Sequence, residues 1–325
     1  MWLVTGATGH LGNVLVRELL ERGEKVRALI LPGECRESIS GLKVEAFDGD
    51  VLDLDSVFQS MRGVKGIFHL AGVISIMPGA NPFVRKVNVD GTKNILRAAK
   101  ESGVKKLIYT SSIHAIRRVE GGMIDETVPY DMDNPYGAYD RSKAEATLEV
   151  LKAADSGLEA VVTCPTGVIG PFDFRGSMMG ALIHDAAIAK PTLYVDGAYD
   201  FVDVRDVADG LISAAENGKR GESYILSGQK ISVRYLLETV REITGRNFFQ
   251  MKIPFDLARF AALFTPMYYQ MANATPRFTP YSLEVLQSNS NISHAKATRE
   301  LGYSPRSLSE SIKDTVKWLL EKRKQ

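Results

Sequence analysis

The first 165 residues alternate short runs of β-branched residues with longer helical patterns. The runs lie at residues 1–5, 25–31, 43–47, 66–70, 105–111 and 158–164, and helical patterns lie at about 11–22, 53–61, 82–102 and 136–155. Because parallel strands are joined by helical crossovers, this alternation predicts a parallel sheet with helices on both faces. We therefore expect an α/β fold, a doubly wound Rossmann sheet of about six strands.

Beyond residue 165 the alternation loosens. Short strands are expected near 191–195, 199–204 and 222–226, and helices near 204–216, 233–244 and 308–320. The pattern predicts a Rossmann domain over residues 1–165 and a smaller, interleaved lobe over 166–325, with some elements returning to the sheet. We find no low-complexity linker, so both parts should form one folding body.

Charge and cysteine content exclude several classes of protein. Forty basic and 39 acidic residues give a net charge of +1, which offers no global field to nucleic acid or an anionic membrane. Cys35 and Cys164 lie far apart, so neither a disulfide framework nor a zinc site is indicated. With no export signal and no run of eighteen apolar residues, the sequence predicts a cytoplasmic protein without a membrane partner.

A glycine-rich loop, TGATGHLG, follows the first strand and precedes the first helix. Gly6 permits a tight turn, Gly9 lets the backbone approach a phosphate, and Gly12 lets helix and strand pack closely. A pyrophosphate can sit there on the exposed amides of the helix N-terminus. The loop predicts a dinucleotide site, although a glycine triplet is also compatible with a structural turn.

The residue that ends the second strand usually distinguishes the two nicotinamide cofactors, and here it is Leu31. Without an acidic residue to bind the ribose hydroxyls, we favour NADP(H) over NAD, with Arg36 as the candidate partner of the 2′-phosphate. A solvated surface charge is an equally good interpretation of Arg36.

Tyr139 and Lys143 stand four residues apart on a predicted helix, which places both side chains on one face. A tyrosine has a pKa of about 10, so proton transfer near neutral pH needs a cation that favours phenolate. Ser112 follows the fifth strand, at the sheet edge where open α/β folds bind ligands. We expect Ser112 to orient a carbonyl oxygen toward Tyr139.

Four motifs, TGATGHLG, NVDGT, YTSS and YDRSK, occur in the order and spacing of a known family. The chain resembles an extended short-chain dehydrogenase/reductase over almost its whole length. The resemblance implies that Lys143 also bonds the nicotinamide ribose, that Asp50 lies at the adenine edge and that Pro165 begins the segment lining the nicotinamide. Asn88 is the first residue of the NVDGT motif, where it has either a structural role or a role in proton relay. The full set of expected cofactor contacts is Gly6, Thr8, Gly9, His10, Leu11, Gly12, Leu31, Arg36, Asp50, Val51, Leu70, Ala71, Gly72, Asn88, Thr110, Tyr139, Lys143, Pro165 and Val168.

Local features favour one branch of this family. Sugar dehydratases carry a Thr-Asp-Glu cluster after the fifth strand, where this chain has Ser111, Ser112 and Ile113. The segments at 165–183 and 201–208 resemble dihydroflavonol reductases, cinnamoyl-CoA reductases and 3β-hydroxysteroid dehydrogenases. We expect hydride transfer between NADP(H) and a small-molecule aldehyde, ketone or secondary alcohol. The alternatives are a nucleotide-sugar epimerase or dehydratase that retains NAD, and a non-catalytic cofactor sensor or scaffold.

Several residues have weaker interpretations. His114 is either a polar substrate contact or a structural residue, and Cys164 is expected to pack as a small hydrophobe. The five histidines form no metal-ligand pattern, so no metal is expected. Phe172, Phe174, Tyr199 and Phe201 suggest a flat or apolar ligand, or core packing; the physiological substrate itself is not encoded in a transferable motif.

The segment at 254–272 is unusually apolar. Core packing or a substrate lid is the favoured interpretation, followed by a dimer contact and then a membrane surface. The family resemblance implies a homodimer through the helices at 82–102 and 136–155.

Overall fold

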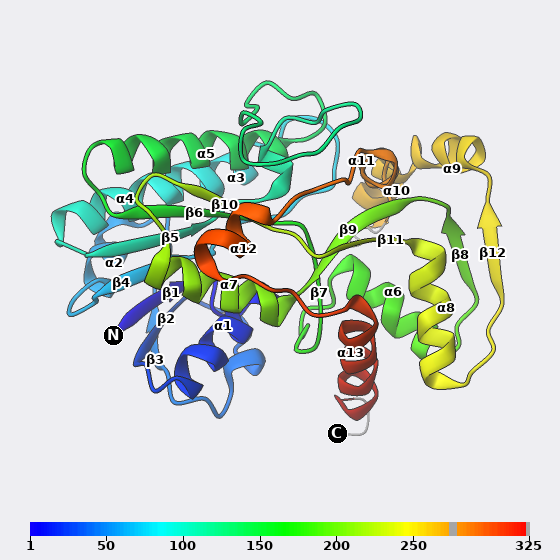
Figure 1. Ribbon diagram of the computed structural model, residues 1–325, viewed down its shortest axis with the longest axis horizontal. Helices are drawn as coiled ribbons and strands as arrows, with labels where there is room; N and C mark the ends of the chain where they lie inside the picture. The colour runs from blue at the N-terminus through cyan, green and yellow to red at the C-terminus, as the bar shows by residue number, and fades with distance from the viewer. Residues whose placement is uncertain (273–277, 323–325) are drawn as a thin grey trace.

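The computed structural model describes residues 1–272 and 278–322, and its centre is a parallel sheet of seven strands (Figure 1). The spatial order is β10-β6-β5-β4-β1-β2-β3. The strands are β1 (Trp2–Thr5), β2 (Val26–Ile30), β3 (Glu45–Asp48), β4 (Gly66–His69), β5 (Lys106–Thr110), β6 (Ala160–Pro165) and β10 (Ser223–Leu226). The six expected strands are confirmed, and β10 adds a seventh beside β6.

Helices cover both faces of this sheet because successive strand residues point to opposite sides. Leu3 packs into the hydrophobic core on one side and Val4 into the core on the other. The first side carries α2 (Leu54–Ser60), α4 (Gly91–Glu101) and α5 (Ala138–Asp155); the second carries α1 (His10–Glu21), α7 (Val204–Asn217) and α12 (Ala295–Leu301). The Rossmann fold predicted from the alternation is therefore confirmed.

The helix expected at 82–102 is interrupted. It consists of α3 (Pro82–Arg85), a π-helical turn η2 (Lys86–Asp90) and α4. Short 3₁₀ turns also follow β2 and β5, namely η1 (Glu37–Ile39) and η3 (Ile113–Ala115). A π-helical turn inside an α-helix often marks a functional position, and this one contains the buried Asn88.

The remaining elements form a lobe at one end of the sheet (Figure 1). One small sheet contains β7 (Gly167–Ile169), β9 (Ala198–Asp203) and β11 (Gln229–Ser232), and another pairs β8 (Thr192–Val195) with β12 (Gln250–Ile253). Around them lie α6 (Met178–Ala187), α8 (Val233–Thr244), α9 (Phe255–Ala262), α10 (Thr265–Ala272), α11 (Pro280–Gln287) and α13 (Leu308–Lys322). The expected helices at 204–216, 233–244 and 308–320 are confirmed as α7, α8 and α13.

The apolar segment at 254–272 was expected to pack in the core. This expectation is wrong for its large side chains, which are exposed. Ala258 and Ala262 are buried, whereas Phe260, Leu263 and Phe264 are each about 60% exposed (62%, 63% and 59%). The small residues, rather than the large ones, face the rest of the protein. Nowhere in the described parts of the chain is a helix both long and apolar enough to cross a bilayer.

Candidate active site

The glycine-rich loop is shaped by close backbone contacts. Gly6 has a left-handed backbone (φ +68°), and a Cβ there would lie 2.8 Å from the Ala71 amide nitrogen. A Cβ on Gly12 would lie 2.1 Å from the Gly6 carbonyl oxygen, so only glycine fits. At Gly9 the closest contact of a Cβ would be 3.3 Å, again to that oxygen. Packing within the protein therefore requires glycine at residues 6 and 12, whereas a Cβ at residue 9 would need only a small shift of its neighbour.

A buried network holds this loop against the ends of β1 and β4. Thr5 Oγ1 accepts hydrogen bonds from the amides of Leu70 and Ala71, at 3.1 and 3.0 Å, and lies 2.8 Å from His69 Nδ1. His69 Nε2 lies 3.0 Å from Thr92 Oγ1, whose hydroxyl donates to a backbone carbonyl. Burial lowers the pKa of His69 to about 3, so the imidazole is neutral, with its proton on Nε2.

The loop 171–175 from the lobe closes over the glycine-rich loop. Asn13 Nδ2 donates to the Phe172 carbonyl oxygen at 3.1 Å, and His10 Nε2 lies 3.0 Å from the Pro171 carbonyl oxygen. Arg175 Nη2 donates to Thr8 Oγ1 at 2.7 Å and forms an ion pair with Glu34. These contacts place an arginine beside the backbone that is shaped for a pyrophosphate.

Leu31 and Arg36 bear on the choice between NAD and NADP(H), and their surroundings differ. Leu31 follows β2 and is 49% exposed. Arg36, expected to be available to a 2′-phosphate, instead forms an ion pair with Asp48 at the end of β3. Asp50 accepts a hydrogen bond from the Leu52 amide at 2.9 Å, and Val51 is buried beside it.

The expected catalytic residues lie together at the carboxyl end of β5. Lys143 Nζ donates to the carbonyl oxygen of Thr110, the last residue of β5, at 2.8 Å. Ser112 is the N-cap of η3, and its Oγ accepts a hydrogen bond from the His114 amide at 3.2 Å. The Ser111 side chain points to α5, where its Oγ lies 2.6 Å from Thr147 Oγ1. Of the two serines, only Ser112 is therefore left to face a ligand with Tyr139.

Burial shifts the pKa values of Tyr139 and Lys143. It raises the pKa of Tyr139 to about 12, while a hydrogen bond with Ser112 acts in the opposite direction. It also lowers the pKa of the Lys143 ammonium to about 8. Desolvation is the largest influence on the pKa of Tyr139, and the Lys143 ammonium is engaged by the Thr110 carbonyl. With this pKa, the phenol of Tyr139 carries its proton at neutral pH.

Asn88 connects three segments of the site from within the π-helical turn. Its Oδ1 accepts from the Val73 amide at 2.7 Å, and its Nδ2 donates to the Val73 carbonyl at 3.0 Å and to Ser142 Oγ at 2.9 Å. A Cβ on Gly72 would lie 3.1 Å from Asn88 Oδ1 and 3.6 Å from Lys143 Nζ. Asn88 therefore fixes the loop after β4 against α5, which is a positioning role.

An aromatic cluster surrounds Tyr139. The His114 ring stacks on Tyr199 with 5.8 Å between ring centroids and meets the Tyr139 ring edge-on at 6.4 Å. Tyr199 OH lies 3.0 Å from His114 Nε2, and burial lowers the pKa of His114, so its ring is neutral. Of the four aromatics singled out earlier, Tyr199 belongs to this cluster, Phe201 packs on Tyr199, and Phe172 and Phe174 pack on Trp318.

Sequence reasoning missed a buried carboxylate in this cluster. Asp140 is 1% exposed, accepts a hydrogen bond from Tyr281 OH at 2.7 Å and lies 3.5 Å from Arg118. Its spacing to Lys143 and Thr147 puts all three on one face of α5, and this periodicity could have revealed it. Tyr281 comes from α11, far along the chain, and no local pattern points to it.

The groups at the carboxyl ends of β1, β5 and β6 fit a nicotinamide dinucleotide. Because Gly9 is the N-cap of α1, no side chain covers the amides of the first turn. The buried hydroxyl of Thr110 finds no hydrogen-bond partner among the described residues. Pro165 ends β6 and Val168 lies on β7. Cys164 is fully buried, and burial raises the pKa of its thiol to about 11, which suits a packing residue.

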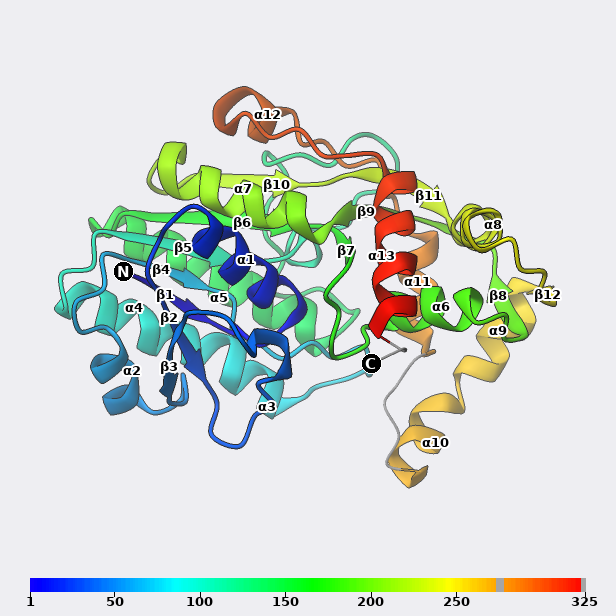
Figure 2. The same cartoon turned by 90° about the horizontal axis from the view of Figure 1, so that it is seen from below.

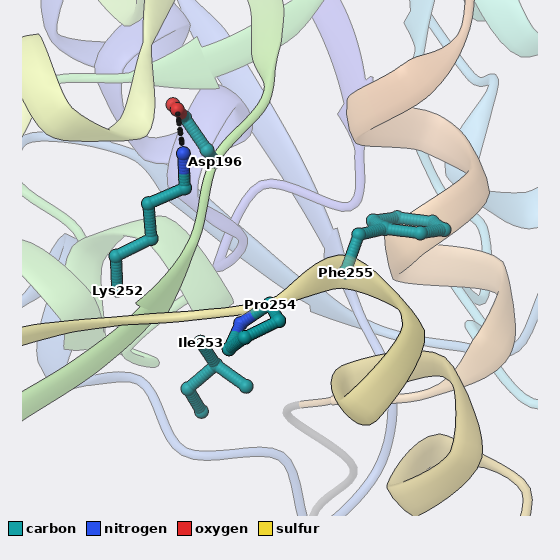
Figure 3. A pocket seen from close by; sticks show the side chains of 5 residues that line it. All are labelled: Asp196, Lys252, Ile253, Pro254 and Phe255. Carbon is teal, nitrogen blue, oxygen red and sulfur yellow. Dashed lines mark hydrogen bonds and ion pairs between the residues drawn. The ribbon is translucent and has the colours of Figure 1, made fainter.

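A second hollow lies in the lobe. A cavity of about 520 Å³ is lined by Asp196, Lys252, Ile253, Pro254 and Phe255 (Figure 3). Lys252 Nζ pairs with Asp196 at 2.8 Å at its margin. None of the expected site residues lines this cavity.

The Rossmann sheet, the glycine-rich loop and the Ser112, Tyr139 and Lys143 group define an extended short-chain dehydrogenase/reductase. Residues 2–227 match the model of the NAD dependent epimerase/dehydratase family, and the chain belongs to that family. It is an NAD(P)-dependent oxidoreductase of the extended short-chain type.

The individual relatives agree with this assignment. Sterol demethylase protein B of Methylococcus capsulatus is 36% identical over 98% of each chain. A 3β-hydroxysteroid dehydrogenase/Δ5→4-isomerase of Mycobacterium tuberculosis is 29% identical, covering 93% of this chain and 85% of that protein. The crystal structure of gox2253 superposes with a TM-score of 0.85 at 34% identity, covering 99% of this chain and 98% of that one.

Proposed function

We propose that this protein reduces the carbonyl group of an apolar ketone or aldehyde with NADPH, with Tyr139 as the proton donor. The observation that carries the proposal is the protonated, buried phenol of Tyr139 beside Ser112, at the carboxyl end of β5. A phenol that is neutral at working pH is suited to donating a proton to a carbonyl oxygen. The nicotinamide cofactor, when bound, supplies the hydride.

Each of the three side chains has a distinct task in this proposal. Ser112 donates a hydrogen bond to the carbonyl oxygen and orients it. Tyr139 transfers its proton to that oxygen as the alcohol forms. Lys143, held by the Thr110 carbonyl, supplies positive charge that stabilises the phenolate left behind and binds the ribose hydroxyls of the cofactor.

Two observations support an apolar substrate. The His114 ring contacts the rings of Tyr139, Tyr199 and Tyr281, so Tyr139 belongs to an aromatic cluster. The relatives named for sterols and steroids are similar over most of this chain. An apolar ring system would gain contact area from such aromatic surfaces. The preference for NADP(H) rests on the absence of an acidic residue at Leu31 and on Arg36 exchanging Asp48 for a 2′-phosphate.

Turnover assays test the proposal. Purified protein is given NADPH or NADH and a panel of steroid and aromatic ketones, and absorbance of the reduced nicotinamide is followed. Tyr139→Phe should lower kcat by about 10² to 10⁴ without changing cofactor affinity. Arg36→Ala should weaken NADPH binding and leave NADH binding unchanged. Full activity of Tyr139→Phe would overturn the mechanism, and tightly retained NAD with no net reduction would favour an epimerase.

We also propose that the protein is a cytoplasmic homodimer that associates through α4 and α5. The family resemblance supports this arrangement. Sedimentation velocity should give a dimer mass, and a monomer at micromolar concentration would argue against it.

A further inference from the structure

Tyr281 of α11 forms a hydrogen bond with a residue that lies 141 positions away in the chain. Its hydroxyl donates to Asp140 Oδ1 at 2.7 Å, and the two residues are buried, at 6% and 1% exposed. Asp140 follows Tyr139 directly, in the first turn of α5. The bond therefore connects the lobe to the helical turn that carries the proposed proton donor.

Asp140 is held more closely by Tyr281 than by its charged neighbour. Its other oxygen, Oδ2, lies 3.5 Å from Arg118 Nη2, beyond the usual hydrogen-bond range of about 2.7 to 3.2 Å. The Arg118 guanidinium lies over the Tyr136 ring, 3.5 Å from its centroid. Because a buried carboxylate that loses a donor is left desolvated, the bond from Tyr281 constrains where Asp140 can lie.

The helix that carries Tyr281 is itself anchored near the site. Thr279, its N-cap, donates from Oγ1 to the Ile76 carbonyl oxygen at 2.8 Å, and so ties α11 to the loop after β4. A capping box closes the first turn of α11, and Leu283 packs with Ala258 of α9. Figure 1 and Figure 2 both show α11 between α5 and α9 along the long axis of the molecule. Tyr281 is therefore presented to α5 from a helix that is fixed on two sides.

The Tyr281 ring also meets the aromatic cluster around Tyr139. Its centroid lies 5.9 Å from that of the His114 ring, which lies 6.4 Å from that of the Tyr139 ring. Ser112, the other residue assigned to the carbonyl oxygen, caps the turn that contains His114. A displacement of Tyr281 would reach Tyr139 through Asp140, and Ser112 through His114.

Proton transfer depends on small distances, and a misplacement of about 1 Å in a positioned group can lower a rate about 10²-fold. We propose that Tyr281 and Asp140 are a positioning pair, through which α11 holds the first turn of α5 so that the Tyr139 hydroxyl meets the carbonyl oxygen bound by Ser112. Neither residue of the pair takes part in the chemistry. This role rests on the proposed reduction, and it makes the lobe a part of the catalytic geometry.

Steady-state kinetics of the full-length protein test the pair. Tyr281→Phe keeps the ring and removes the hydroxyl, so kcat should fall at least about tenfold while KM and the dissociation constant of the cofactor change by less than about twofold. Asp140→Ala should give a similar loss. Asp140→Asn keeps an oxygen that accepts from Tyr281, so its kcat should stay within about threefold of the parent. The double variant Tyr281→Phe and Asp140→Ala should lose no more than either single variant, because each removes the same bond.

The matched control is Tyr303→Phe, which removes another buried hydroxyl, one that donates to the Ser227 carbonyl oxygen at 3.1 Å. It should leave kcat unchanged, with all assays run below the melting transition of each variant. An equal loss in this control would assign the effect to general packing. Asp140→Asn as slow as Asp140→Ala would assign it to charge. Either result, or an unchanged kcat in Tyr281→Phe, overturns the proposal.

Fluorine NMR separates this proposal from the proposed reaction. Protein labelled with 3-fluorotyrosine has a Tyr139 resonance that is assigned by its absence in Tyr139→Phe. This resonance should shift or broaden in Tyr281→Phe and stay unchanged in Tyr303→Phe, and an unmoved resonance in Tyr281→Phe overturns the pair. If the parent reduces no ketone or aldehyde and the resonance still moves, the proposed reaction fails and the pair is supported. If Tyr139→Phe abolishes reduction and Tyr281→Phe changes neither kcat nor the resonance, the reaction is supported and the pair is overturned.

Discussion

Arg175 reaches from the loop after β7 to the glycine-rich loop and donates a hydrogen bond to Thr8 Oγ1 at 2.7 Å. Its guanidinium is therefore positioned beside the amides that we expect to bind a pyrophosphate. Arg175→Ala should raise the dissociation constant of the cofactor about tenfold, because a charge-assisted contact is lost. Fluorescence titration measures this constant.

The matched control for that substitution is Arg22→Ala, which removes an arginine paired with Asp209 on the surface of α1 and α7. It should leave cofactor affinity unchanged. Equal weakening by both substitutions would mean that overall charge, rather than the contact with Thr8, governs binding.

The pKa of Lys143, about 8, predicts the pH dependence of carbonyl reduction. The ammonium stabilises phenolate only while it is protonated, so kcat/KM should fall about tenfold per pH unit above pH 8. Tyr139, with a pKa of about 12, stays protonated throughout this range. In Lys143→Arg the cation persists, so the rate should be lower overall and flat up to about pH 10. The same descending limb in both proteins would assign it to another group.

Alanine substitutions at two glycines of the loop should distinguish an effect on folding from an effect on cofactor binding. Gly12→Ala should prevent or strongly destabilise folding, by more than about 3 kcal/mol, because its Cβ would lie 2.1 Å from a backbone oxygen. Gly9→Ala, whose closest contact would be 3.3 Å, should melt close to the parent yet bind cofactor at least about tenfold more weakly. Thermal melting and cofactor titration test both. Unimpaired binding by Gly9→Ala would argue against phosphate contact at this residue.

His69 should make the protein sensitive to acid. Its folded pKa of about 3 lies below the usual 6.5, so the unfolded chain binds a proton in this window that the folded one does not. Stability should therefore fall between pH 6.5 and 3, by up to about 1.4 kcal/mol per pH unit from this residue. His69→Gln can accept from Thr5 and donate to Thr92, so its denaturation midpoint should decline less steeply. Parallel declines would exclude His69 as the cause.

The sequence was most informative where function and local geometry coincide. The glycine loop, the six strands and the Tyr139 and Lys143 spacing could be read because each depends on residues close together in the chain. The same periodicity could have included Asp140. Arg175, Tyr281 and Tyr199 could not be found this way, since their site contacts join segments that are distant in sequence.

The sequence left two features open because they depend on tertiary neighbours. Arg36 is a basic residue in the expected loop, but whether it faces a ligand depends on Asp48 at the end of the adjacent strand. The apolar pattern at 254–272 identified helices correctly but not the direction of their large side chains, because Ala258 and Ala262 pack against Leu283 of α11.

The sequence by itself determined the doubly wound sheet, the glycine-rich loop and the candidates for the reactive residues, because strand periodicity, glycine requirements and helical spacing are local properties. Only the tertiary structure decided the protonation of Tyr139, Lys143 and His69, since desolvation depends on everything packed around a group. It also decided which apolar side chains of α9 and α10 stay exposed.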